Sequence, residues 1–145
     1  MTIDTLEPKA IFRHFAALAA IPRASGKEAA ARAYVLEQAS RLGLEAIQDS
    51  AGNVVIRKPA SPGRESAPMA ALQSHLDMVC EKNEGTAHDF DVDPIQLVVD
   101  GDWLKAAGTT LGADNGVGVA SALAVLESAD IAHGPLEFVF TIDEE

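Results

Sequence analysis

The hydrophobic pattern at the start of the chain predicts two helices. Within residues 8–20, the apolar residues recur with the period of a helix: Ile11, Phe12, Phe15, Leu18 and Ala19. Pro8 is suited to the first turn of that helix. Ser25 and Glu28 then have the spacing of a capping box, which predicts that an Ala-rich helix begins there. Gly43 is suited to end that helix.

Short apolar runs further along predict strands. We expect strands over 44–48, 53–58 and 136–142, a buried strand over 69–74, and a hairpin built from 95–99 and 103–106. A further apolar helix is expected over about 117–128, and 76–94 is expected to be a long acidic loop. Because helices alternate with apolar strands, the predicted fold class is α/β.

Composition and charge narrow the class of protein. The 145 residues are 48% hydrophobic, which is enough for a core and too apolar for intrinsic disorder. No apolar stretch is long enough to cross a bilayer, and the single cysteine together with a start lacking a secretory signal predicts a cytoplasmic protein. The net charge of −11 argues against nucleic acid as a partner. Residues 75–145 hold 15 of the 22 acidic residues. These carboxylates can form a solvated acidic face, or some of them can converge on divalent cations.

Three groups of ionisable side chains stand at the end of an apolar strand or in a loop that opens a helix. They are His75 with Asp77, Asp114 in a glycine-rich loop, and Glu144 with Glu145. Open α/β sheets bind ligands at such places. Imidazole and carboxylate groups suit a divalent ion, and an Asp two residues after a metal-bound His can orient it through the free ring N–H.

Each group also has a simpler interpretation. His75 and Asp77 can be neighbours on the surface, and Asp114 can cap the helix that follows it. Glu144 and Glu145 can both be solvated; otherwise, one of two adjacent carboxylates could bind a metal while the other acts as a base. Taken together, the three groups favour a metal site.

Longer stretches of the sequence resemble the M20 metallopeptidases, and most of all their cytosolic aminoacyl-histidine (Xaa-His) dipeptidase branch. The resemblance covers essentially the whole chain and is most specific in the last of five segments: 72–79, 82–83, 88–90, 93–95 and 108–116. It implies a mixed sheet flanked by helices, as part of a zinc-peptidase catalytic domain. The implied activity is hydrolysis of the peptide bond of small dipeptides such as Xaa-His. The net charge and the short apolar runs described above favour neither nucleic acid nor a membrane as a partner.

The resemblance also implies roles for the site residues. His75 is a ligand of one divalent ion, Asp114 bridges two, and Glu145 is a ligand of the second. Glu144 is implied to be the general base, and Asp77 to orient His75. Zinc is the expected metal, although cobalt or manganese suits the same ligands.

Five protein ligands are implied for the two ions, and residues 1–145 supply three. We therefore expect an Asp and a late His beyond residue 145, and residues 1–145 to be the N-terminal part of the catalytic domain, inactive when isolated. A smaller lid or dimerisation domain, and with it a homodimer, is expected only of a longer protein. The resemblance further implies a cis peptide bond between Asp114 and Asn115.

Two other functions stay open from the sequence. One is a related M20 amidohydrolase or tripeptidase acting on N-acyl amino acids or tripeptides; the other is a non-catalytic, truncated module. Five further residues of chemical interest are expected to lie outside the site: His14, Cys80, His88, Trp103 and His133. Of these, His14 is expected to be peripheral and Trp103 to be a packing residue.

Overall fold

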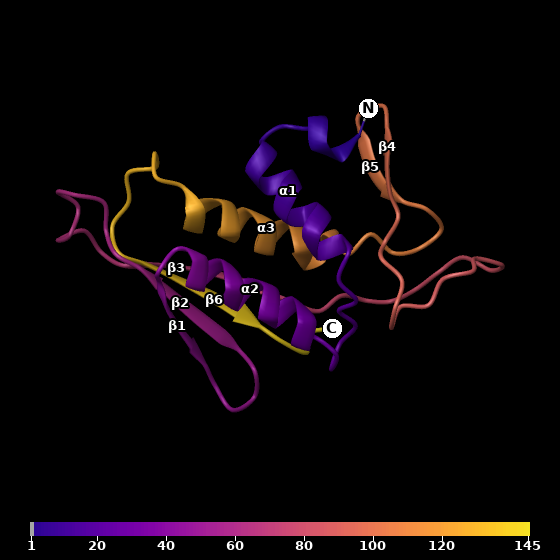
Figure 1. The fold of residues 1–145 in the computed structure, drawn as a ribbon, viewed down its shortest axis with the longest axis horizontal. Coiled ribbons are helices and arrows are strands. Elements are labelled where there is room, and N and C mark those ends of the chain that lie inside the picture. Colours follow the sequence, from indigo (N-terminus) through magenta and orange to yellow (C-terminus); the bar gives the residue numbers. More distant parts are fainter. Residues whose placement is uncertain (1) are drawn as a thin grey trace.

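The computed structural model describes residues 2–145 and has two sheets and three α-helices (Figure 1). The elements in chain order are a 3₁₀ turn at Ile3–Thr5, α1 (Lys9–Ala19), α2 (Ala29–Arg41), β1 (Glu45–Gln48), β2 (Val54–Lys58), β3 (Ala70–His75), β4 (Leu97–Asp100), β5 (Trp103–Ala106), α3 (Ala113–Glu127) and β6 (Leu136–Thr141). Each helix and strand expected from the hydrophobic pattern is present, with small differences at the ends.

The main sheet is mixed, as the resemblance implied. Its four strands are ordered β1-β2-β6-β3; β2 pairs antiparallel with β1 and with β6, whereas β3 runs parallel to β6. The β4–β5 hairpin forms a separate two-stranded sheet. The α/β prediction is therefore confirmed, and the parallel β3–β6 pair brings two strand carboxyl ends together.

The core lies between one face of the main sheet and the helices. In β6, Leu136, Phe138 and Phe140 are buried, whereas the alternate residues are half-buried. Val54 and Ile56 of β2 are fully buried on the same face, where apolar residues of α1, α2 and α3 pack against them. α1 packs mainly on α3, and α3 packs on β3, so α3 is the link between the sheet and the outer helix (Figure 1).

The prediction that 69–74 is a buried strand is wrong for most of its length. Met69, Ala70, Ala71 and Gln73 are exposed, because β3 pairs with β6 on one side and lies at the edge of the described sheet. Burial begins at Ser74 and continues beyond the end of the strand. The buried end is the end that carries the ionisable residues.

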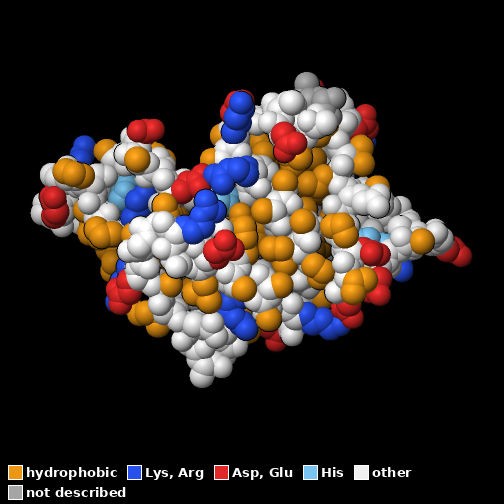
Figure 2. Space-filling model, viewed as in Figure 1, with side chains coloured by type: hydrophobic (Ala, Val, Ile, Leu, Met, Phe, Trp, Pro, Cys, Tyr) orange, Lys and Arg blue, Asp and Glu red, His pale blue; other side chains and the backbone are white. Residues whose placement is uncertain are grey.

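The loop between β3 and β4 and the β4–β5 hairpin extend away from the main sheet (Figure 1). Acidic side chains gather over the projecting loop (Figure 2). Trp103 at the start of β5 is 70% exposed, so its expected role as a packing residue is wrong. Among residues 2–145, no helix is both long and apolar enough to span a membrane.

His14, which the sequence predicts to be peripheral to the site, is only 1% exposed and lies where α1, α2 and α3 meet. Its Nδ1 lies 2.7 Å from the hydroxyl of Tyr34 on α2, and its Nε2 lies 3.3 Å from a carboxylate oxygen of Glu127 on α3. Burial lowers the pKa of His14; Glu127 opposes this shift, and Arg13 and Arg41 add to it. The folded state therefore favours the neutral imidazole.

We expect this imidazole to make the protein less stable in mild acid. In the unfolded state His14 becomes protonated as the pH falls through about 6.5, whereas in the folded state it stays neutral to a lower pH. The free energy of unfolding should therefore decrease as the pH falls below about 6.5. Urea denaturation between pH 5 and 8 measures this, with His14→Gln as the comparison. An unchanged pH dependence in the variant would assign the effect to other groups.

Candidate metal centre

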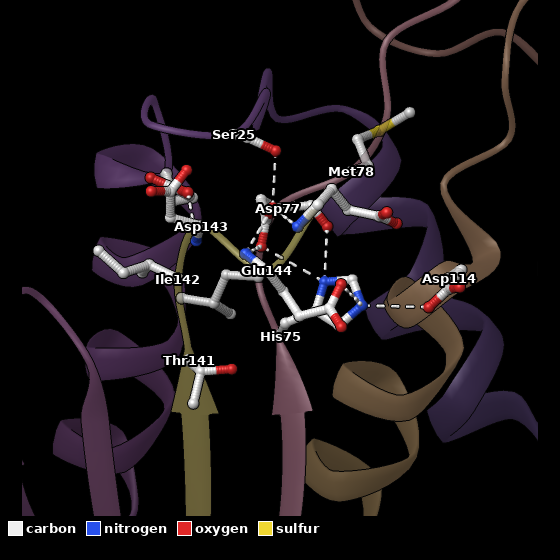
Figure 3. Close-up of polar contacts among 12 residues, drawn as sticks. Ser25, His75, Asp77, Met78, Asp114, Thr141, Ile142, Asp143 and Glu144 are labelled. Carbon is white, nitrogen blue, oxygen red and sulfur yellow. Dashed lines mark hydrogen bonds and ion pairs between the residues drawn. The ribbon is translucent and has the colours of Figure 1, made fainter.

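The three groups of ionisable residues meet at the carboxyl ends of β3 and β6. His75 is the last residue of β3 and pairs with Thr141 of β6. The Leu76 amide then donates to the Thr141 carbonyl over 2.8 Å, which keeps the two chains together beyond the strands. Asp114 reaches the same place from the start of α3, and Glu144 follows β6 (Figure 3).

The side-chain distances are short enough for a shared ion. His75 Nε2 lies 3.1 Å from Asp114 Oδ1 and 3.7 Å from Glu144 Oε2. Among residues 2–145, one cluster of His, Cys, Asp or Glu offers three ligand atoms within 4.8 Å of one another: His75, Asp114 and Glu145. These residues are 39 and 31 positions apart in sequence, so the fold alone brings them together.

Burial differs sharply across the site. The His75 side chain is 6% exposed, whereas the side chains of Asp114 and Glu144 are 83% and 57% exposed. The imidazole thus forms the floor, and the carboxylates of Asp114, Glu144 and Glu145 form a rim open to solvent. Three carboxylates beside one imidazole favour a bound cation, because it relieves their mutual repulsion.

Asp77 is a fully buried hydrogen-bond hub behind His75. One of its oxygens accepts from the Ser25 hydroxyl over 2.7 Å and from the backbone amides of Glu144 and Glu145 over 3.0 Å each (Figure 3). Burial raises the pKa of Asp77, but these hydrogen bonds outweigh it and hold the pKa below the ordinary value. Asp77 is therefore an anion that fixes the backbone of both glutamates.

The imidazole is oriented from the same side. His75 Nδ1 lies 3.2 Å from the Asp77 carbonyl oxygen and 3.3 Å from Asp77 Oδ1. A proton on Nδ1 has two acceptors there, which leaves the lone pair of Nε2 directed at Asp114. This is the geometry in which an imidazole can bind a cation through Nε2.

Asp114 is not a helix cap. The backbone is non-helical at Asp114 and Asn115, just before the regular part of α3, and among residues 2–145 no backbone amide donates to the Asp114 carboxylate. The peptide bond between these two residues is cis, as the resemblance implied. The alternative interpretation of Asp114 as a cap is therefore wrong, and its carboxylate faces His75 instead.

The capping box predicted at Ser25 and Glu28 is also wrong. Glu28 is the N-cap residue of α2 and makes no side-chain cap bond. Its buried carboxylate accepts from the amides of Gly26 and Asp143, both over 2.9 Å, whereas the Ser25 hydroxyl donates to Asp77. Neither residue was predicted to be a neighbour of the site, because a helix cap explains the same residue types at the same spacing.

The other candidate residues lie outside the site, as expected. Cys80 packs beside Ala19, Met78 and Ile95, and burial raises the pKa of its thiol. His88 packs edge-on against Phe90 with ring centroids 4.4 Å apart.

Comparisons with known proteins identify the family of the chain. Residues 71–145 match the family described as Peptidase family M20/M25/M40, a range that contains all five predicted site residues. The chain is 48% identical over 143 residues to the cytosol non-specific dipeptidase of Escherichia coli, covering 99% of this chain and 30% of that protein.

Solved structures of peptidases share the fold of the chain. The aminoacylhistidine dipeptidase of Vibrio alginolyticus is 50% identical with a TM-score of 0.98, over 100% of this chain and 30% of that one. A dinuclear metal-binding M20 peptidase of Bacillus subtilis shares the fold, at 18% identity and a TM-score of 0.53, over 90% of this chain and 34% of that one. The chain thus spans about a third of the length of these relatives.

Proposed function

The chain belongs to the peptidase family M20/M25/M40, and from this premise we propose that it carries the metal-binding part of a two-metal dipeptidase. The observation that supports the proposal most directly is the convergence of His75, Asp114 and Glu145 within 4.8 Å. In this proposal residues 1–145 are the N-terminal part of the catalytic domain, and the whole protein hydrolyses small dipeptides in the cytosol.

The proposed ligand roles are those that the resemblance to the M20 metallopeptidases implies, and the cluster of donor atoms supports them. His75 and Asp114 would hold one divalent ion, and Asp114 and Glu145 the other. Zinc is the expected metal, because one imidazole and carboxylates without sulfur suit zinc, and cobalt or manganese would fit the same donors. When bound, such a pair lowers the pKa of a shared water towards ~7 and polarises the scissile carbonyl.

Glu144 is the proposed general base. Its carboxylate lies 3.7 Å from His75 Nε2, next to the ligand cluster but not within it, and more than half of the side chain faces solvent. A carboxylate there can take a proton from the attacking water and deliver it to the leaving amine. The amide of Glu144 is held by Asp77, which limits where the carboxylate can move.

The substrate class is proposed from the relatives. Two relatives are identical to this chain at about half of the aligned residues; both are dipeptidases, one of them named for aminoacyl-histidine. A tripeptidase from Staphylococcus aureus shares the fold at 24% identity and a TM-score of 0.73. The larger similarity to the dipeptidases favours dipeptides, Xaa-His among them, over tripeptides or N-acyl amino acids.

A metal titration tests the proposal. We expect the full-length protein to bind Zn²⁺ and the Asp114→Ala variant to bind it more weakly, because the variant lacks the proposed bridging ligand. Loss of an outer-shell partner weakens metal binding by roughly 10–100-fold, and the effect of Asp114→Ala should be larger. Isothermal titration calorimetry measures the affinity, with Asp130→Ala, an exposed Asp beyond α3, as the matched control. Equal affinity of wild type and Asp114→Ala would contradict the metal site.

A further inference from the structure

Arg23 is a buried guanidinium without a carboxylate partner. It is 2% exposed, and no ion pair within 4.0 Å involves it in the part of the chain that the structure describes. Burying a charge is unfavourable unless hydrogen bonds or opposite charges compensate. A residue kept at such a cost needs a structural explanation.

The two terminal nitrogens of the guanidinium donate instead to three backbone carbonyls, whereas the buried Nε has no hydrogen-bond partner among the described residues. Nη1 donates to the carbonyls of Leu76 over 2.9 Å and Asp77 over 3.2 Å, and Nη2 donates to the carbonyl of Gly112 over 2.6 Å. Two of these carbonyls lie just after His75, and the third lies two residues before Asp114. One planar group therefore joins the end of β3 to the loop that opens α3.

The connection reaches the imidazole itself. The Asp77 carbonyl oxygen that accepts from Arg23 also lies 3.2 Å from His75 Nδ1. On the other side, His75 Nε2 faces Asp114, which follows the Gly112 carbonyl in the chain. Arg23 thus contacts the backbone on both sides of the 3.1 Å gap between the two side chains.

Two glycines of the 108–116 segment make room for this guanidinium. A Cβ on Gly112 would lie 2.5 Å from Arg23 Nη2, and one on Gly116 would lie 2.8 Å from the same atom. Gly112 also has a φ of +70°, which favours glycine. The glycine-rich segment and Arg23, far apart in sequence, are therefore complementary in shape.

We propose that Arg23 is a positioning residue that sets the separation of His75 and Asp114 by binding the Leu76, Asp77 and Gly112 carbonyls. The inference rests on the proposed metal site. Metal sites tolerate displacements of only about half an ångström in their ligands, so a bridge between the two ligand-bearing segments should affect both affinity and coordination geometry.

Arg23→Lys is the most informative variant. Lysine keeps the charge and the aliphatic stem, but a single ammonium cannot bind carbonyls on both segments in the way a planar fork does. Co²⁺ is the probe, because its visible absorption spectrum reports coordination geometry. We expect Arg23→Lys in the full-length protein to bind Co²⁺ about 10–100-fold more weakly, with a changed spectrum.

Controls separate positioning from stability. Arg57→Met removes an arginine that pairs with Glu137 on the sheet, away from the site, and should leave the Co²⁺ spectrum unchanged. Arg23→Met provides a second test without the charge. Binding is compared at a temperature where circular dichroism shows each variant folded.

The outcomes are distinct. A wild-type affinity and spectrum in folded Arg23→Lys or Arg23→Met would overturn the positioning role, and failure of both variants to fold would assign Arg23 to stability alone. If the wild-type protein bound no Co²⁺, or bound it equally after His75→Ala, the proposed function itself would fail.

Discussion

Glu144→Gln should retain the bound metal and lose nearly all dipeptide hydrolysis. Glutamine keeps the size of the side chain and the backbone hydrogen bonds to Asp77, but its amide cannot take a proton from water. General acid–base groups contribute about 10²–10⁴-fold to rate, so kcat should fall by that order. The measurements are kcat with an Xaa-His dipeptide and zinc content by elemental analysis, both on the full-length protein.

Companion variants separate the two adjacent glutamates. Glu145→Gln should lower the metal content, because Glu145 belongs to the ligand cluster. Glu37→Gln, on the exposed side of α2, should change neither quantity. If Glu144→Gln lost its zinc along with its activity, the two proposed roles would have to be exchanged.

The elements that determine the site were predictable because they are local. Strand 136–141 has alternating burial and ends just before the acidic residues, and Gly43 follows α2 with a positive φ of 66°. The placement of His75 at the end of a strand followed in the same way. Such features depend on neighbours within one or two turns of the chain, which the sequence pattern records.

The contacts that hold the site together were not predictable, because they join segments far apart in sequence. Ser25 and Asp77 are 52 residues apart, and Arg23 and Gly112 are 89 apart. A polar residue before a helix is most simply explained as a cap, so Ser25 and Glu28 were assigned locally although their partners are distant. Burial of β3 was overestimated for a related reason: the sequence does not say which strand lies at an edge.

The segment from Arg23 to Glu28 therefore has a larger part in the site than its composition suggested. Arg23 joins the segments that carry His75 and Asp114, Ser25 donates to Asp77, and Glu28 accepts from the amide of Asp143. Each contact fixes backbone or a buried anion next to a proposed ligand. The predicted ligands were sufficient to indicate a metal centre, whereas Arg23 did not stand out in the sequence, and Ser25 and Glu28 were expected only as a helix cap.

A polypeptide limited to residues 1–145 should hydrolyse no dipeptide, even with excess zinc, cobalt or manganese. His75 and Asp114 would give one ion two protein ligands, and Asp114 and Glu145 would give the other two. Catalytic zinc commonly has three protein ligands besides water, so each ion would be one ligand short. Weak binding at the open carboxylates would not fix the water and Glu144 in a reactive geometry.

The assay compares this polypeptide with the full-length protein on the same Xaa-His dipeptide at equal concentration, after circular dichroism has shown that the polypeptide is folded. Its Asp114→Ala variant defines the background rate. Turnover by residues 1–145 clearly above that background would mean that three protein ligands suffice. The two-ion arrangement around Asp114 would then have to be replaced by a single-ion site.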